Sequence, residues 1–307
     1  MSEGDRVAVE PAITCEARGI EPPCPPCGRG QISSCQQLDS KVITPGMALG
    51  FTSGLGGGWA EQVVAHRSML FPIPDAVPDR AASLHEPVSI ATHGLLRQPP
   101  PPGVPVAVVG CGIIGLAAIA ALRTLFPDNP VVALARYEHQ EAAALATGAD
   151  QVVRSVDGGD HFDALASSTG TRVIGRKRHR MLAAGFPYVV EAVGTTGSVN
   201  DALRMADNRG TVLLLGAAGL AEYDLTLVWW KELALVGAIN HSPDPGPHGG
   251  ATRHSVARAL DILASGQLPH DVVVTHEFAL ADYRAAIATA MDRQAGAIKV
   301  VFRPNGS

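Results

Sequence analysis

The sequence predicts an α/β protein built on a doubly wound parallel sheet, preceded by a region rich in turns and cysteine. Its 307 residues suit two domains of ordinary size. After residue 103, apolar strand-like runs alternate with helix-length stretches, as in a parallel sheet covered on both faces. A glycine-rich turn follows the first of these runs. Hydrophobic residues make up 46% of the chain and charged residues 17%, which excludes wholesale disorder.

The chain begins with short elements. A strand is expected at residues 7–9 before the cysteines, and a second strand at 59–65 after a glycine-rich turn. Residues 78–82 have the form of a helix start. The proline run at 98–103 then breaks the chain and marks a boundary or hinge.

Six strands are expected after this break, which is the number that a doubly wound sheet domain uses. Helices are expected between most of them, notably at 113–126 and 138–147. The expected strands are 104–109, 131–135, 151–153, 188–193, 211–215 and 233–236.

Charge and hydropathy argue against two kinds of partner. The net charge of −5 disfavours non-specific binding to nucleic acid. Residues 104–122 are apolar enough to suggest a membrane helix, but they divide into a strand, a glycine cluster and a helix. The first five residues are acidic and polar, unlike a signal peptide. The expectation is a cytoplasmic protein that binds neither nucleic acid nor membrane.

One basic cluster lies at residues 172–180 and reads RVIGRKRHR. We interpret it as a solvated loop between two elements of the sheet domain. A nucleic-acid contact is the weaker alternative, because no aromatic residues are interleaved to stack on bases.

The turn after the first strand of the sheet has the form G-x-G-x-x-G. Gly110 allows the tight turn, Gly112 allows a pyrophosphate to approach the backbone, and Gly115 lets the helix pack against the sheet. The free N–H groups at the helix start, at Ile113 and Ile114, would bind the phosphates. The sequence therefore predicts a dinucleotide-binding (Rossmann) domain. Further candidate cofactor-binding residues follow later strands, at Val193, Gly194 and Gly216.

The residue that meets the adenosine ribose suggests which dinucleotide is bound. A site for NAD places an acidic residue about 20 positions after the glycine loop. Here that position is Ala135, and Arg136 follows it. A guanidinium in place of a carboxylate favours a 2′-phosphate, so NADP is predicted and NAD stays possible.

Four of the five cysteines lie within 21 residues, at Cys15, Cys24, Cys27 and Cys35. In a secreted chain this cluster would suggest disulfides, but without an export signal a metal site is the better interpretation. The x2 spacing between Cys24 and Cys27 is typical of a turn that presents two sulfurs to one tetrahedral zinc. The cluster is predicted to hold one structural zinc ion.

Several motifs occur in a fixed order along nearly the whole chain. Together they resemble the zinc-dependent medium-chain alcohol dehydrogenase superfamily, nearest to its sorbitol and threonine dehydrogenase branch. The motifs are residues 4–11 (GDRVAVEP), the cysteine cluster, 57–61 (GGWAE), Glu86-Pro87, the glycine loop, 210–212 (GTV) and 296–301 (GAIKVV).

The resemblance implies a fold, an activity and an assembly. A GroES-like, β-rich catalytic domain would comprise residues 1–95 and the returning segment 239–307, with the Rossmann domain at 96–238. Its members transfer a hydride between an alcohol or polyol (or the matching carbonyl compound) and NADP(H) or NAD(H), and form dimers or tetramers. The family's cysteine cluster has two residues between its first and second members, whereas this chain has eight between Cys15 and Cys24.

The family also holds a catalytic zinc. Glu86 resembles the glutamate near that metal, whereas the family's cysteine and histidine ligands precede the GDRV motif, and this chain begins three residues before it. The expectation is therefore an N-terminally incomplete catalytic domain with slow turnover. His66, His85 and His93 are expected to be hydrogen-bonded structure, not replacement ligands.

Two other functions remain open alongside the dehydrogenase. One is a non-catalytic dinucleotide-binding remnant or partner subunit. The other is a zinc-free quinone or enoyl reductase of the same superfamily, against which the cysteine cluster and Glu86-Pro87 both argue.

Overall fold

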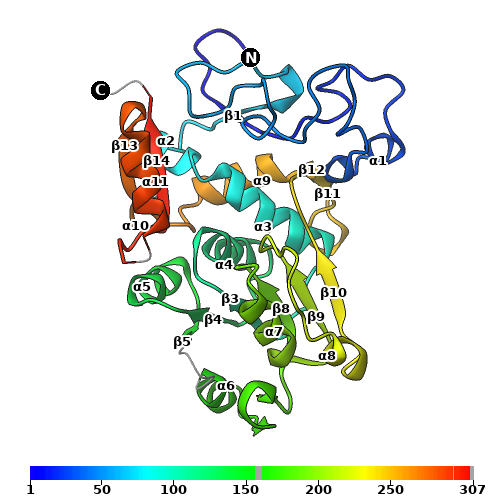
Figure 1. The fold of residues 1–307 in the computed structure, drawn as a ribbon, viewed down its shortest axis with the longest axis vertical. Helices are drawn as coiled ribbons and strands as arrows, with labels where there is room; N and C mark the ends of the chain where they lie inside the picture. Colours follow the sequence, from blue (N-terminus) through cyan, green and yellow to red (C-terminus); the bar gives the residue numbers. More distant parts are fainter. Residues whose placement is uncertain (156–160, 293, 305–307) are drawn as a thin grey trace.

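A six-stranded sheet forms the centre of one half of the molecule (Figure 1). The computed structural model describes residues 1–155, 161–292 and 294–304. The strand order is β10-β9-β8-β3-β4-β5, and all neighbouring pairs are parallel. The winding reverses between β3 and β8, where doubly wound sheets bind their ligands. The strands are β3 (Val106–Val109), β4 (Val131–Ala135), β5 (Gln151–Arg154), β8 (Phe186–Glu191), β9 (Ala206–Leu214) and β10 (Ala234–Gly237).

Each face of the sheet has its own core, because side chains alternate along a strand. In β3, Val106 and Val108 belong to one core, and Ala107 and Val109 to the other. Helices α3, α4, α5 and α9 contribute to the first core, and α6, α7 and α8 to the second. They are α3 (His85–Arg97), α4 (Ile113–Leu125), α5 (Glu138–Thr147), α6 (His161–Thr169), α7 (Thr196–Met205), α8 (Thr226–Trp230) and α9 (Ser255–Ala264).

The local sequence explains why the helices beside the glycine loop form where they do. Helix α4 is apolar on all sides and is buried from Gly115 to Leu122, as expected of a helix packed between a sheet and other helices. Helix α5 ends at Gly148, whose φ of +109° supplies the left-handed residue that closes a helix.

Most of the remaining elements are short and lie toward the other end of the molecule, which also contains the N-terminus (Figure 1). Three two-stranded pairs occur there: β1 with β2, β11 with β12, and β13 with β14. The elements are β1 (Val7–Val9), α1 (Pro25–Gly28), β2 (Leu70–Pro72), α2 (Asp79–Ala82), β11 (Pro243–Asp244), β12 (Arg253–His254), α10 (His270–Val273), β13 (Val274–Ala279), α11 (Tyr283–Met291) and β14 (Lys299–Arg303).

The C-terminal segment packs against the N-terminal one across a large distance in sequence. Ser33 donates its N–H to Ser242 Oγ at 3.2 Å, and the rings of Phe71 and His254 lie 4.6 Å apart. The ring of Trp59 meets that of Phe302 edge-on at 5.1 Å.

Most elements predicted for the sheet domain are present. In the region before it, the strand expected at residues 59–65 is absent. This segment has no strand partner among the described residues, and Trp59 and Val64 are exposed. An alternating apolar pattern makes a strand only where a neighbouring backbone pairs with it, so the prediction was wrong. Within the described residues, no helix has the length and apolar character needed to cross a membrane.

The basic segment was also only partly anticipated. It forms a hairpin of β6 (Val173–Ile174) and β7 (Met181–Leu182), joined by a 3₁₀ turn at Lys177–His179. It is therefore not simply a solvated loop.

Candidate functional site

A cavity of about 1070 Å³ opens at the carboxyl ends of β3, β4 and β8. Its position is the one at which doubly wound sheets bind ligands, and its size is that of a cofactor site. The residues that line it include the glycine loop, Arg136 after β4, Val193 after β8, and the start of α7.

The glycine loop leaves no room for side chains at two of its positions. Gly110 has a φ of +93°, and a Cβ there would lie 2.2 Å from Val193 Cγ2. A Cβ at Gly115 would lie 1.8 Å from the carbonyl oxygen of Gly110. Both glycines are therefore required by the turn and by the packing of α4 on the sheet.

Gly112 has a different role, because the space around its Cβ position is open. It is the N-cap of α4 and provides no side-chain cap. Gly112, Ile113 and Ile114 all line the cavity, so the uncapped N–H groups of the first helical turn are available to an anion.

The end of β4 forms another part of the cavity wall. Ala135 is fully buried, and Arg136 lines the cavity. The backbone of Arg136 is held on both sides: its N–H donates to Gln140 Oε1 at 3.2 Å, and its carbonyl accepts from Arg154 Nη2 at 3.0 Å. The guanidinium carbon lies 5.9 Å from the centre of the Tyr137 ring.

Glu191, at the end of β8, shapes the opposite wall. Its buried carboxylate accepts the N–H groups of Val193 at 3.0 Å and Gly194 at 2.9 Å. Val193 lines the cavity, whereas Gly194 packs against Ala217 and Gly216 packs against Gly194. Gly194 and Gly216, like Gly115, therefore shape the site from behind its lining.

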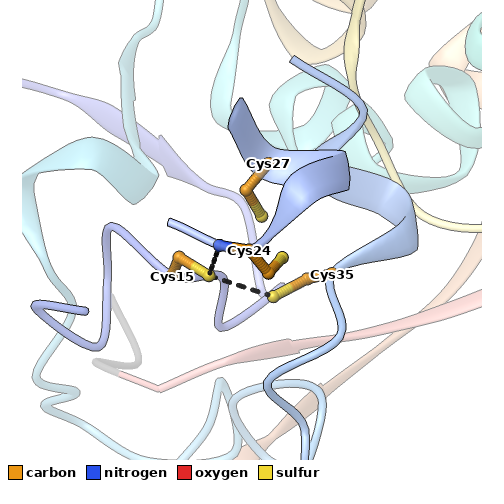
Figure 2. A group of neighbouring side chains, drawn as sticks. All are labelled: Cys15, Cys24, Cys27 and Cys35. Atoms are coloured by element: carbon orange, nitrogen blue, oxygen red, sulfur yellow. Dashed lines mark hydrogen bonds between the residues drawn. The ribbon is translucent and has the colours of Figure 1, made fainter. Parts of the chain in front are cut away.

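The four clustered thiols converge on one point, as Figure 2 shows. The Sγ atoms of Cys15, Cys24, Cys27 and Cys35 all lie within 4.8 Å of one another, and those of Cys15 and Cys35 are 3.8 Å apart. A tetrahedral zinc with Zn–S bonds of about 2.3 Å needs sulfurs about 3.8 Å apart. The donor set and spacing therefore fit a zinc ion.

The long spacing after Cys15 is accommodated by a compact turn. Ile20 N–H donates to the carbonyl of Cys15 at 2.9 Å, and Gly19 N–H donates to that of Glu16 at 3.0 Å. The chain thus reverses within a few residues, which keeps Cys15 beside Cys24.

Backbone N–H groups that donate to the sulfur atoms also stabilise thiolates in the cluster. Cys24 N–H donates to Cys15 Sγ, and Gln36 N–H to Cys24 Sγ, each at 3.4 Å. Burial raises the pKa of the Cys15 and Cys27 thiols. Burial acts in the same direction at Cys24, but hydrogen bonds with Gln36, Cys27 and Cys15 outweigh it and lower the pKa of Cys24 to about 7. The first thiolate therefore forms most easily at Cys24.

Glu86 lies in the first turn of α3, with 39% of its side chain exposed. Its Oε1 is 3.9 Å from Nε2 of His241, which is buried. Among the described residues, the cysteine cluster is the one group of three or more potential metal ligands whose ligand atoms all lie within 4.8 Å of one another, and Glu86 is outside it.

A buried polar cluster behind Glu86 was not predicted from the sequence. Glu10 Oε1 is 3.3 Å from His241 Nδ1, and its Oε2 is 3.3 Å from His254 Nε2. Burial alone would raise the pKa of Glu10, but the hydrogen bonds and charges of the two histidines outweigh it and lower the pKa. One signal was present in the sequence. Side chains alternate along a strand, so Glu10, two residues after the buried Ala8, is expected on the same inward side.

The three histidines that were considered as alternative ligands make hydrogen bonds within the protein. His66 Nδ1 accepts from Ser68 N–H at 3.2 Å. His85 lies between the carbonyls of Ala82 and Val9, and burial lowers its pKa. His93 Nδ1 contacts the buried carboxylate of Asp244 at 2.9 Å.

Two family models match the chain. The alcohol dehydrogenase GroES-like domain model matches residues 1–75, and the zinc-binding dehydrogenase model matches residues 114–263. Both regions were expected from the motifs, and together they cover most of the chain. The chain belongs to the zinc-dependent medium-chain alcohol dehydrogenase superfamily. By family it is an oxidoreductase of the alcohol dehydrogenase type.

Curated relatives of this alcohol dehydrogenase family member match nearly its whole length. It is 28% identical over 305 residues to D-arabinitol dehydrogenase 1 of Uromyces fabae, and the match covers 98% of this chain and 76% of the relative. It is also 28% identical to L-idonate 5-dehydrogenase of Vitis vinifera (97% and 72% covered) and 23% identical to sorbitol dehydrogenase of Bacillus subtilis (98% and 75% covered).

Solved structures show the same fold. A zinc-binding dehydrogenase from Sinorhizobium meliloti, bound to NADP, superimposes with a TM-score of 0.75 at 24% identity, covering 99% of this chain and 78% of the other. L-idonate 5-dehydrogenase from Escherichia coli gives a TM-score of 0.75 at 23% identity, with 98% and 76% covered.

Proposed function

We propose that the protein transfers a hydride between the hydroxyl-bearing carbon of a polyol or alcohol and NADP(H), with NAD(H) as the alternative cofactor. The observation that carries the cofactor assignment is Arg136, which lines the cavity at the end of β4 where an NAD site has a carboxylate. The substrate class rests on the relatives, which are named for D-arabinitol, L-idonate and sorbitol.

The residues present fit a bound dinucleotide. The N–H groups of Gly112, Ile113 and Ile114 would bind its pyrophosphate, Arg136 its 2′-phosphate, and Val193 an apolar part of it. The nicotinamide ring, when bound, accepts or donates the hydride. We assign residues 96–238 to this cofactor domain, and 1–95 with 239–307 to the catalytic domain.

We also assign the cysteine cluster to a structural zinc. Four thiolates close the coordination shell, so no position is left for a substrate. The ion would fix the loop between Cys15 and Cys35, which has only short helical turns of its own.

The described residues do not fit a complete catalytic zinc site. Such a site takes three protein ligands and one open position. Glu86 is accompanied only by His241, whose other ring nitrogen contacts Glu10. The described residues therefore give no basis for a metal-dependent step at Glu86. This shortage of ligands favours a second candidate function, that of a dinucleotide-binding protein with no turnover.

We expect the purified chain to bind NADPH and to reduce NADP⁺ only slowly with a panel of polyols. A polyol hydroxyl that is not polarised by a metal stays protonated near neutral pH, which makes hydride loss slow. The rate should be at least about a hundredfold below the typical enzymatic value of about 10 s⁻¹. It should not rise when zinc is added.

Absorbance at 340 nm measures the turnover, and calorimetry measures NADPH binding. Cofactor binding without any polyol-dependent reduction would support the second candidate function. Fast turnover that depends on added zinc would contradict the ligand count and would implicate Glu86 with His241 or another histidine.

We propose a homodimer that pairs through β10, with a tetramer as the larger alternative. Among the described residues this strand has β9 as its one neighbour, so no described strand pairs with its outer edge. Leu235 on the strand is exposed, as are Trp229 and Trp230 just before it. An apolar open edge is suited to pairing with a second copy across a two-fold axis. Light scattering should give at least twice the chain mass of 31.8 kDa, and Leu235→Lys should lower the measured mass. A monomeric wild-type protein would contradict the assignment.

We place the protein in the cytoplasm. All five cysteines are free thiols, and a thiolate cluster for zinc persists best in a reducing compartment.

A further inference from the structure

We propose that the hairpin of β6 and β7 forms the adenosine end of the dinucleotide site, and that Lys177 and Arg180 bind the 2′-phosphate together with Arg136. The inference deepens the proposed function and rests on its assignment of NADP. It also gives a role to the basic cluster that the sequence alone left as a solvated loop.

The hairpin is built to hold its turn in place. Its base is closed by Ala183 N–H, which donates to the carbonyl of Arg172 at 2.9 Å, and by Ala184 N–H, which donates to Thr171 Oγ1 at 3.0 Å. Met181 and Leu182 belong to the core on the second face of the sheet, so the second strand is anchored to the body of the domain.

The turn itself is tight. A Cβ at Gly175, which has a φ of +81°, would lie 2.1 Å from the carbonyl oxygen of His179. Lys177 has a φ of +52°, in the left-handed region. This folding places Lys177 and Arg180 on the wall of the cavity that also contains the glycine loop and Arg136.

The basic side chains of this wall are suited to binding an anion. Four of its side chains are basic, namely Arg136, Lys177, Arg180 and Arg204, whereas Asp201 is the one carboxylate among the lining residues that the structure describes. Asp201 is paired with Arg204 at 3.2 Å. In the proposed function the glycine loop binds the pyrophosphate. The basic side chains of this wall are then suited to a further phosphate, which NADP carries and NAD lacks.

Arg180 is held in an orientation suited to this role. Its Nη2 lies 2.5 Å from Oδ2 of Asp163, in the first turn of α6. That carboxylate is largely exposed and fixes the guanidinium at the rim of the cavity without removing it from the wall. Both strand β7 and helix α6 therefore position this side chain.

A buried histidine at the same place is a second indication of a ligand. His161 lines the cavity with 4% of its side chain exposed. Neither ring nitrogen makes a hydrogen bond of good geometry to a described residue; the nearest carboxylate oxygen, Asp201 Oδ2, is 3.3 Å from Nε2. A bound adenosine would offer it a partner.

The test uses two fragments that differ by one phosphate, adenosine 2′,5′-bisphosphate and 5′-AMP, with binding measured by calorimetry on the full chain. We expect Lys177→Asn to weaken the binding of the bisphosphate about tenfold, because one charge-assisted contact is lost. The affinity for 5′-AMP should be unchanged. Asparagine tolerates a positive φ, so the turn is retained. Arg180→Gln should act in the same direction. Arg172→Gln, which removes an exposed charge from the same hairpin outside the cavity, is the matched control and should change neither ligand.

The outcomes separate this inference from the assignment of NADP. If the wild-type protein binds both fragments equally, the assignment of NADP fails, and the role of the hairpin fails with it. If Arg136→Ala removes the preference but Lys177→Asn and Arg180→Gln do not, NADP stands and the role of the hairpin is overturned. An equal loss for both fragments in Lys177→Asn would also overturn it, because the contact would then be to the shared part of the nucleotide.

Discussion

One zinc ion per chain is expected in the purified protein, and Cys27→Ser should abolish its binding. The four Sγ atoms are already grouped at the separations that a tetrahedral ion requires. Replacing one thiolate by a hydroxyl removes a strong ligand, and the other three sulfurs are then left close together without a cation between them.

The loss of the ion should destabilise the lobe around it markedly. Zinc binding contributes directly to folding, because the unfolded chain does not present a preformed site. Removal of a structural metal belongs to the largest single-site effects on stability, above about 4 kcal/mol. Elemental analysis gives the stoichiometry, and denaturant unfolding of Cys27→Ser against wild type gives the change in unfolding free energy.

Two further variants make this experiment specific. Cys111→Ala is the matched control, because Cys111 is buried in the glycine loop, away from the cluster, and zinc content should be unchanged. Cys15→Ser tests the fourth ligand, and unchanged zinc content in it would remove Cys15 from the site. A metal-replete wild-type protein without zinc would contradict the assignment altogether.

The sheet domain could be predicted closely because its signals are local. β4 and α5 have the bounds that their apolar patterns indicated, and the glycine loop lies between a strand and a helix as its spacing requires. Each of these features is decided by residues within one turn or one strand, so a single sequence contains what is needed.

The polar cluster could not be predicted in the same way, because its members come from distant segments. Glu10 and His241 are 231 positions apart, yet they lie in hydrogen-bond contact. Only the packing of β1 against the returning C-terminal segment brings them together. The prediction of a strand at 59–65 failed for a related reason, since a strand depends on a partner strand that its own residues do not specify.

Arg136→Ala should weaken NADPH binding by about 10- to 100-fold and leave NADH binding nearly unchanged. A charge-assisted contact between guanidinium and phosphate contributes about 1.5–3 kcal/mol, and NADH has no phosphate at this position. The two backbone hydrogen bonds that hold residue 136 do not depend on its side chain, so they should be retained in this variant.

Arg136→Lys refines this expectation, since it retains the charge but loses the planar fork that binds phosphate in a bidentate manner. Its affinity for NADPH should therefore fall between those of the wild type and Arg136→Ala. Calorimetry with both cofactors on all three proteins provides the comparison, and NADH is the internal control in each. Tighter binding of NADH than of NADPH by the wild type would reject the cofactor assignment. An equal loss of affinity for both cofactors in Arg136→Ala would show instead that this side chain supports the shape of the cavity. The preference for a 2′-phosphate would then have to come from the hairpin.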